Sequence, residues 1–232
     1  MMMARIPAAS RLAVARLLRT RRARLAIVGW AIFATATAIL ERATGATSGA
    51  DHLMTGLFGR VVLPLQTFAI VSAVVGGSGL KPGVAGLVAL GAKRERAVLG
   101  TTAVALLASA LLASALALAV VALAHGATDP PLLSDLVATA WIAALGGAAY
   151  GAYFSAAAAL GRTGAARAVF LVFDFLVAGL AGVLAVLTPR GHLLSLFGGP
   201  PCAELSQRAS SGALVLLAVG YVVVTLAFAR RP

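Results

Sequence analysis

The sequence predicts an all-α, polytopic membrane protein with six transmembrane helices and both termini in the cytoplasm. Three observations predict it: long uncharged runs, a composition that is 61% hydrophobic and only 11% charged, and basic clusters in every second segment between the runs, which puts them on one side. A helix needs about 20 apolar residues to cross a hydrocarbon core of about 30 Å. The uncharged runs, interrupted once by an aspartate in the fifth, are 25–40, 61–80, 97–124, 136–161, 168–188 and 209–229. The first run reaches that length only with flanking residues.

The distribution of basic residues predicts the orientation. Fifteen of the 19 Lys and Arg residues lie in segments 5–24, 81–96, 162–167 and 230–231, which share one side of the six runs. An excess of Lys and Arg marks the cytoplasmic side of a membrane. The net charge of +12 therefore suits anionic lipid headgroups rather than nucleic acid, since no basic face interleaved with aromatic residues is present.

The N-terminal segment 1–24 contains no acidic residue and predicts an interfacial helix on the cytoplasmic surface. Its Arg21-Arg22 pair before an apolar run resembles an export signal, and its Arg-rich character resembles a mitochondrial presequence. Five further spans argue against a cleaved signal. Residues 25–232 are expected to form one transmembrane domain. The short apolar stripe of the interfacial helix would consist of Val14, Leu17 and Leu18.

Segment 81–96, between the second and third runs, carries the most specific local pattern. Pro82 can begin a helix, and Gly91 can end it. An apolar edge in that helix is followed by a basic cluster. This pattern predicts a short helix lying along the cytoplasmic surface, of a kind that docks another protein; a solvated basic loop is the alternative.

The last external connection, 189–208, combines apolar residues with a Gly-Gly-Pro-Pro break. It predicts a short re-entrant helix that dips into the outer leaflet, with an ordinary loop as the alternative. The single cysteine, Cys202, excludes a disulfide framework within one chain. The three histidines, His52, His125 and His192, are expected in external loops and lack the spacing of metal ligands.

Two polar residues interrupt the predicted spans. Asp174 lies in the fifth run, where a carboxylate is costly and suggests a function. Its partner would be a basic residue such as Arg167, two helical turns earlier, or a group on another subunit. A structural ion pair at headgroup depth is the alternative. Gln66, close to the kink expected at Pro64, is the second candidate, so Gln66 and Asp174 are the expected pathway or interface residues.

The fourth run contains small residues at a spacing that favours close helix packing. Gly147 and Gly151 lie four residues apart, so they occupy the same face of a helix. Such small-xxx-small spacing lets two helix backbones approach each other. In so alanine-rich a chain it predicts packing rather than a function.

The sequence offers no catalytic site. Residues 76–79 read Gly-Gly-Ser-Gly, which matches the Gly-x-Ser-Gly string of rhomboid proteases. Nucleophilic Ser78 would need a base within hydrogen-bond reach, and no run contains a histidine. A phosphate-binding Gly-x-x-x-x-Gly-Lys-Ser/Thr loop is also missing, so the chain is not expected to hydrolyse ATP itself. No metal or other cofactor is expected.

The layout resembles the permease subunits of ABC-2 type transporters. Those subunits have six spans, both ends inside, an interfacial N-terminal helix, a coupling helix between spans two and three, and re-entrant helices between spans five and six. Residues 87–94, an apolar turn followed by small residues and Arg, are similar to their coupling segments. The short first span departs from the family pattern.

That resemblance implies an exporter in the bacterial cytoplasmic membrane, and the use of 17 Arg against two Lys is typical of GC-rich bacterial genomes. Two permease subunits would form the translocation path, and separate ABC ATPase subunits would dock beneath them. A secondary transporter or channel and a non-transporting scaffold stay open as alternatives, although the two halves show no convincing repeat. The substrate is not indicated. The residues expected to contact the ATPase are Leu87, Leu90, Gly91, Lys93, Arg94 and Arg96.

Overall fold

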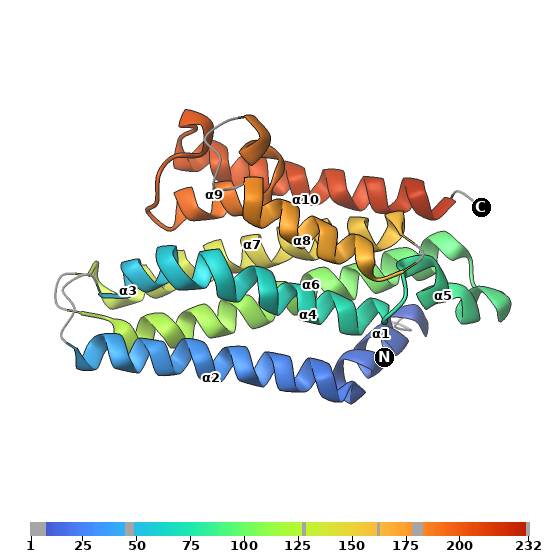
Figure 1. Cartoon of the computed structure of the whole chain (residues 1–232), viewed down its shortest axis with the longest axis horizontal. Helices are drawn as coiled ribbons and strands as arrows, with labels where there is room; N and C mark the ends of the chain where they lie inside the picture. The colour runs from blue at the N-terminus through green and yellow to red at the C-terminus, as the bar shows by residue number, and fades with distance from the viewer. Residues whose placement is uncertain (1–7, 45–48, 127–128, 162, 178–182, 231–232) are drawn as a thin grey trace, which may run out of the picture.

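A computed structural model describes residues 8–44, 49–126, 129–161, 163–177 and 183–230. Almost all of these residues lie in helices, which form a bundle of long, roughly parallel rods (Figure 1). The all-α prediction is therefore confirmed for the part of the chain that the structure describes. In chain order the elements are α1 (Ala8–Arg19), α2 (Arg21–Ala43), α3 (Gly49–Leu53), the π-helix η1 (Met54–Val62), α4 (Leu63–Val75), α5 (Leu80–Ala89), α6 (Arg94–Ala124), α7 (Leu132–Leu160), α8 (Ala165–Val177), η2 (Val183–Leu187), α9 (Pro189–Leu196), η3 (Cys202–Glu204) and α10 (Gln207–Arg230).

Five helical rods are long and apolar enough to cross a membrane. They are α2, the continuous rod Gly49–Val75, α6, α7 and α10. The first rod, α2, has 23 residues and begins before run 25–40. The helix already includes the arginines that directly precede the uncharged run. Long arginine side chains at a helix end can keep their charge near the membrane surface, so they need not end the helix.

The predicted fifth span is described in two pieces. Helix α8 has 13 residues, and η2 has five. At 1.5 Å per residue α8 is about 20 Å long, which is shorter than a hydrocarbon core of about 30 Å. Residues 178–182 between the two pieces lie outside the described residues, so a sixth crossing stays a prediction.

The beginning and the end of the described chain lie at one end of the bundle, together with α5 (Figure 1). Ser10 Oγ on α1 donates to the backbone oxygen of Gly100, near the beginning of α6. Arg230, the last residue of α10, forms an ion pair with Glu95 on the first turn of α6. This end is called the α5 end below.

Helices α6 and α7 form the centre of the bundle. Their backbones approach closely where α7 has glycine: a Cβ placed on Gly147 would lie 2.6 Å from the backbone oxygen of Ser109, and one on Gly151 would lie 3.0 Å from Cα of Leu106. Both distances are shorter than ordinary van der Waals contact. The prediction that Gly147 and Gly151 serve helix packing is confirmed, and the partner is α6 of the same chain.

The outer surface of the bundle is apolar, and several polar side chains lie inside. Large exposed apolar residues occur on each of α2, α6, α7 and α10, including Ile32, Leu111, Trp141 and Leu216. Buried polar residues include Asp174 and a set of serines and threonines. An extended apolar surface of this kind marks a membrane or partner interface. Together with the five long apolar rods, it fits a polytopic helical membrane protein.

Candidate functional site

The short helix predicted in segment 81–96 is present as α5, and its end has a specific cause. After the last residue of α5, Gly91 adopts a φ of +91°, which favours glycine. The amide of Gly91 donates to the oxygen of Val88, and the amide of Ala92 donates to that of Leu87. This pair of bonds is a Schellman motif, which satisfies carbonyls at the end of a helix. Gly91 therefore ends the helix, as its position in the sequence predicts.

The chain leaves this helix with its side chains directed to solvent. Leu90, directly after α5, is 87% exposed. Lys93, Arg94 and Arg96 are exposed as well, whereas Leu87 is half-buried and packs against the core. The structure therefore brings the predicted contact residues together at the α5 end. They present one large apolar side chain and a basic cluster.

Two arginines fasten α5 to the bundle. Arg16 on α1 donates to the backbone oxygens of Val75 and Gly83, at 3.2 and 2.9 Å. Arg167 on α8 donates to the oxygens of Gly76 and Gly77, at 3.0 and 3.3 Å. These four carbonyls belong to the last turn of α4, the connection to α5 and α5 itself. Helices α1, α4, α5 and α8 are therefore joined at one point.

Arg167 was one of the alternatives predicted as the partner of Asp174, and the cation beside that carboxylate is Arg190 instead. Asp174 is fully buried, and its Oδ2 accepts a hydrogen bond of 2.9 Å from the hydroxyl of Tyr150 on α7. The same oxygen lies 3.5 Å from Nε of Arg190 on α9. The Arg190 guanidinium also lies over the ring of Phe175, 3.6 Å from its centroid. Since a buried carboxylate needs a nearby cation and donors, this arrangement accounts for Asp174 inside the bundle.

Arg190 also binds the second rod, Gly49–Val75. Its Nη2 donates to the backbone oxygen of Arg60 in η1. Pro64 follows four residues later and has no N–H with which to complete the α-helical bond to that oxygen. A nine-residue π-helix is rare, and π-helical turns occur frequently at functional sites. The side chain of Arg190 thus supplies a donor to a carbonyl that proline leaves without its usual partner.

Two further contacts dock α9 on η1. Thr55 Oγ1 donates to the oxygen of Phe197 at 2.6 Å, and the rings of Phe58 and Phe197 meet edge to face with centroids 6.1 Å apart. A Cβ on Gly59 would lie 3.2 Å from Leu194. The expected short helix in segment 189–208 is therefore present and packs tightly on the second rod.

The centre around Asp174 lies far from both ends of α7. Tyr150 is ten residues before Leu160, the last residue of α7, and 18 residues after its first residue, Leu132. At 1.5 Å per residue, Tyr150 is about 15 Å from the α5 end of α7. Asp174 and Arg190 meet Tyr150 at this level, so α9 begins level with the middle third of α7.

Three residues of the predicted external connection 189–208 are buried against the bundle, and His192, which was expected in a loop, lies in α9. Arg190 is 6% exposed, because it reaches Asp174 and the carbonyl of Arg60. His192 is fully buried, and its Nε2 lies 3.0 Å from the oxygen of Val186. Cys202 is 6% exposed and packs against Gly191, where a Cβ would lie 2.8 Å from its Sγ. The physical reason is shared: α9 and η3 fold back onto the bundle.

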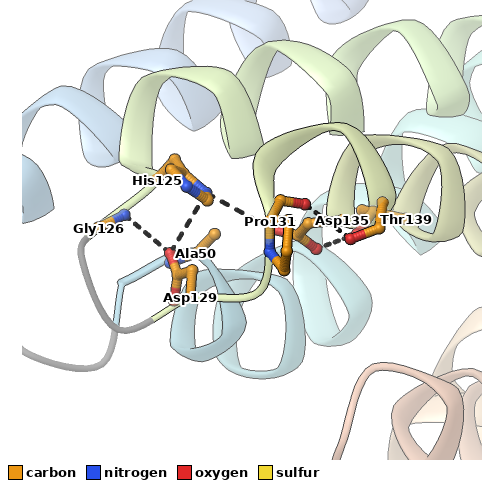
Figure 2. A network of polar contacts seen from close by, with 8 residues as sticks. Ala50, His125, Gly126, Asp129, Pro131, Asp135 and Thr139 are labelled. Carbon is orange, nitrogen blue, oxygen red and sulfur yellow. Dashed lines mark hydrogen bonds and ion pairs between the residues drawn. The ribbon is translucent and has the colours of Figure 1, made fainter.

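A second polar network lies at the opposite end of the bundle (Figure 2). Asp129 Oδ2 accepts hydrogen bonds from the amides of Gly126 and Ala50, at 2.9 and 3.2 Å. His125 Nδ1 lies 3.8 Å from this oxygen and 3.9 Å from Oδ2 of Asp135. The network joins α3, the end of α6 and the first turn of α7, and thus holds three elements together.

Gln66, the other predicted pathway residue, is buried on α4, and its Oε1 has no hydrogen-bond partner. An unpartnered amide oxygen inside the bundle is costly. The structure therefore leaves Gln66 as a polar group whose role its contacts do not explain.

Sequence reasoning missed Arg190 and Tyr150 as partners of Asp174. A usable signal was present for one of them, because Arg190 is the first basic residue after Asp174 in the chain. Tyr150 lies in another helix, so only the packing of α7 against α8 identifies it.

The described residues include no group of three His, Cys, Asp or Glu side chains placed to hold a metal ion. No family model matches the chain, and no curated protein matches it. The functional candidates are therefore the exposed segment after α5 and the buried centre at Asp174.

Proposed function

We propose that this chain is the membrane-spanning permease subunit of an ABC-2 type ATP-binding cassette transporter, acting as an exporter in the bacterial cytoplasmic membrane. Two permease subunits form the translocation path, and separate ATPase subunits dock at the α5 end and hydrolyse ATP. The observation that carries the proposal is α5 with the exposed segment that follows it. A short helix followed by an exposed leucine and three basic side chains suits a partner-docking element.

The proposed topology follows from the same arrangement. The α5 end faces the cytoplasm, because most basic residues lie there. Helix α1 rests at the membrane surface, six spans cross the membrane, and both termini are cytoplasmic. Helix α9 is then re-entrant from the outer side. Its start level with the middle third of α7 supports this, since non-spanning backbone at that depth must be surrounded by protein.

The fastening of α5 supports a role in coupling. Arg16 joins α5 to α1 and to the end of α4, and Arg167 joins the connection that leads into α5 to the start of α8, so a displacement of α5 would pull on three helices at once. A docking element attached in this way can transmit a movement of a bound ATPase to the spans. A solvated loop without such bonds would absorb the movement.

A co-purification experiment tests the proposal. The tagged chain is extracted from its native membranes in mild detergent, and stoichiometric partners are identified by mass spectrometry. We expect a protein with a Gly-x-x-x-x-Gly-Lys-Ser/Thr loop, near one per permease chain. A homo-oligomer that retains no ATPase even after crosslinking would overturn the proposal and favour a secondary transporter, a channel or a scaffold.

Neutralising the basic cluster after α5 tests the contact residues. The variant Lys93→Gln, Arg94→Gln and Arg96→Gln is expected to lose most of the co-purifying ATPase while inserting normally. Its matched control removes three exposed charges at the start of α2: Arg21→Gln, Arg22→Gln and Arg24→Gln. Equal ATPase recovery from the two variants would show that the segment after α5 is not the docking element.

A further inference from the structure

A basic pocket opens at the α5 end, where α6 begins and α10 ends. Its volume is about 810 Å³. The side chains that line it come from two regions of the sequence that are more than 130 residues apart: Lys93, Arg94, Glu95, Arg96, Ala229 and Arg230. The pocket thus adds the end of α10 to the segment already proposed to bind an ATPase.

The pocket carries four positive side chains and one negative one. Its single acid, Glu95, holds Arg230 through an ion pair of 2.9 Å between Oε1 and Nε. Both partners are more than half exposed. An exposed ion pair contributes little to stability because water screens it, so Glu95 can be exchanged for another carboxylate.

The start of α6 adds to the positive potential. Lys93 is the N-cap residue of this 31-residue helix, and no side chain caps its first amides. Free N–H groups at a helix N-terminus carry partial positive charge, which attracts anions. Helix α6 therefore directs its positive end, together with Lys93, Arg94 and Arg96, toward the pocket.

We propose that this pocket receives an acidic protrusion of the ATPase subunit, whose carboxylates engage Arg94 and Arg96 and replace Glu95 at Arg230. This inference rests on the proposed function and names the chemistry of the partner surface. The pocket is continuous with the exposed segment after α5, so a protein docked on that segment reaches the pocket as well. Arg230 thereby couples the docked ATPase directly to α10.

The proposal predicts opposite effects for the two members of the ion pair. Glu95→Gln removes the competing carboxylate and makes the pocket more positive, so ATPase retention rises. Arg230→Gln removes one contact and makes the pocket less positive, so retention falls. A change of about three-fold in each direction is expected for charges at an exposed interface. A purely structural ion pair would make both variants fall together, because either change breaks the same bond.

The test measures the amount of ATPase that co-purifies with the N-terminally tagged full chain at several salt concentrations. The expected order of retention is Glu95→Gln, wild type, then Arg230→Gln, with the differences shrinking as salt screens the charges. Arg19→Gln, an exposed arginine of α1 outside the pocket, is the matched control and should behave as wild type. Thermal unfolding of each variant checks that it is folded.

The outcomes separate this inference from the proposed function. If wild type and Arg230→Gln retain the ATPase equally, the pocket proposal fails while the permease proposal stands. If wild type retains no ATPase, both fail. A separate experiment places wild type and Arg230→Gln in nanodiscs with and without anionic lipid, and measures the retained lipid and the retained ATPase. If Arg230→Gln changes the retained lipid but not the ATPase, the pocket is a headgroup site and the proposal is overturned.

Discussion

The guanidinium of Arg190 donates a hydrogen bond to the backbone oxygen of Arg60, 130 residues earlier in the chain. That oxygen lies four residues before Pro64, which cannot complete an α-helical bond to it. The same guanidinium faces Asp174. One side chain therefore satisfies a carbonyl in an irregular helix and a buried carboxylate, and it joins the second rod, α8 and α9. Removing the charge of Arg190 or of Asp174 should therefore weaken the contacts among these three elements.

Loss of the Asp174 carboxylate should destabilise the bundle strongly. Asp174→Ala leaves the buried Arg190 guanidinium without its anion and the Tyr150 hydroxyl without its acceptor. Breaking a buried ion pair by removing one partner costs about 3–5 kcal/mol. We expect a clear fall in the unfolding temperature, measured in detergent by circular dichroism.

Two further variants separate charge pairing from a general effect of substitution. The double variant Asp174→Asn with Arg190→Gln contains no unpaired charge and should recover part of the stability lost by Asp174→Ala. Arg208→Gln removes an exposed arginine in the first turn of α10 and should change stability by less than about 0.5 kcal/mol. Equal losses in the single and double variants would contradict the proposed pairing.

Asp174 also shows what sequence patterns could and could not predict. Runs of apolar residues predicted the long rods, because hydrophobic length depends only on local sequence. Gly91 ended α5 where expected, because a positive φ is also a local property. The partners of Asp174 depend on how α7, α8 and α9 pack, which no local pattern encodes. The short helix in segment 189–208 was predicted from its local pattern, whereas the burial of its polar Arg190 and His192 depends on how that helix packs on the bundle.

Substituting Gly147 should separate α6 from α7. A Cβ at this position would lie 2.6 Å from the backbone oxygen of Ser109, which cannot move as a flexible side chain could. Gly147→Ala is therefore expected to cost about 1–3 kcal/mol through overpacking. Gly220→Ala on α10 is the matched control, since a Cβ there would meet nothing within 4 Å. Alanine favours helix over glycine, so the control should be neutral or slightly stabilising. Similar unfolding temperatures for both variants would contradict the close approach.

The thiol of Cys202 should react slowly with maleimide near neutral pH. Burial disfavours the thiolate and raises the pKa of Cys202 above its usual value. The thiolate is the reacting species, so the labelling rate should stay low through pH 7–8 and rise only at higher pH. Ser206→Cys in a Cys202→Ser background provides an exposed thiol four residues away and should label faster at each pH. Equal rates for the two thiols would mean that η3 does not bury Cys202.

The connection between α4 and α5 should open when either of its two arginines is removed. Arg167→Gln leaves the oxygens of Gly76 and Gly77 without their charged donor, and Arg16→Gln does the same for Val75 and Gly83. Hydrogen bonds from a charged group contribute about 1.5–3 kcal/mol, so local opening should become roughly ten-fold more frequent or more.

Hydrogen–deuterium exchange of residues 76–92 measures this opening, with Arg19→Gln at the exposed end of α1 as the control. Arg16→Gln should also speed exchange in α1, because Arg16 fastens that helix to α4 and α5, whereas Arg167→Gln should act on the start of α8. Exchange that changes equally in all helices would indicate a loss of global stability. Unchanged exchange in residues 76–92 would mean that these bonds do not hold α5 in place, and would remove the physical basis for transmitting a movement of α5 to the spans.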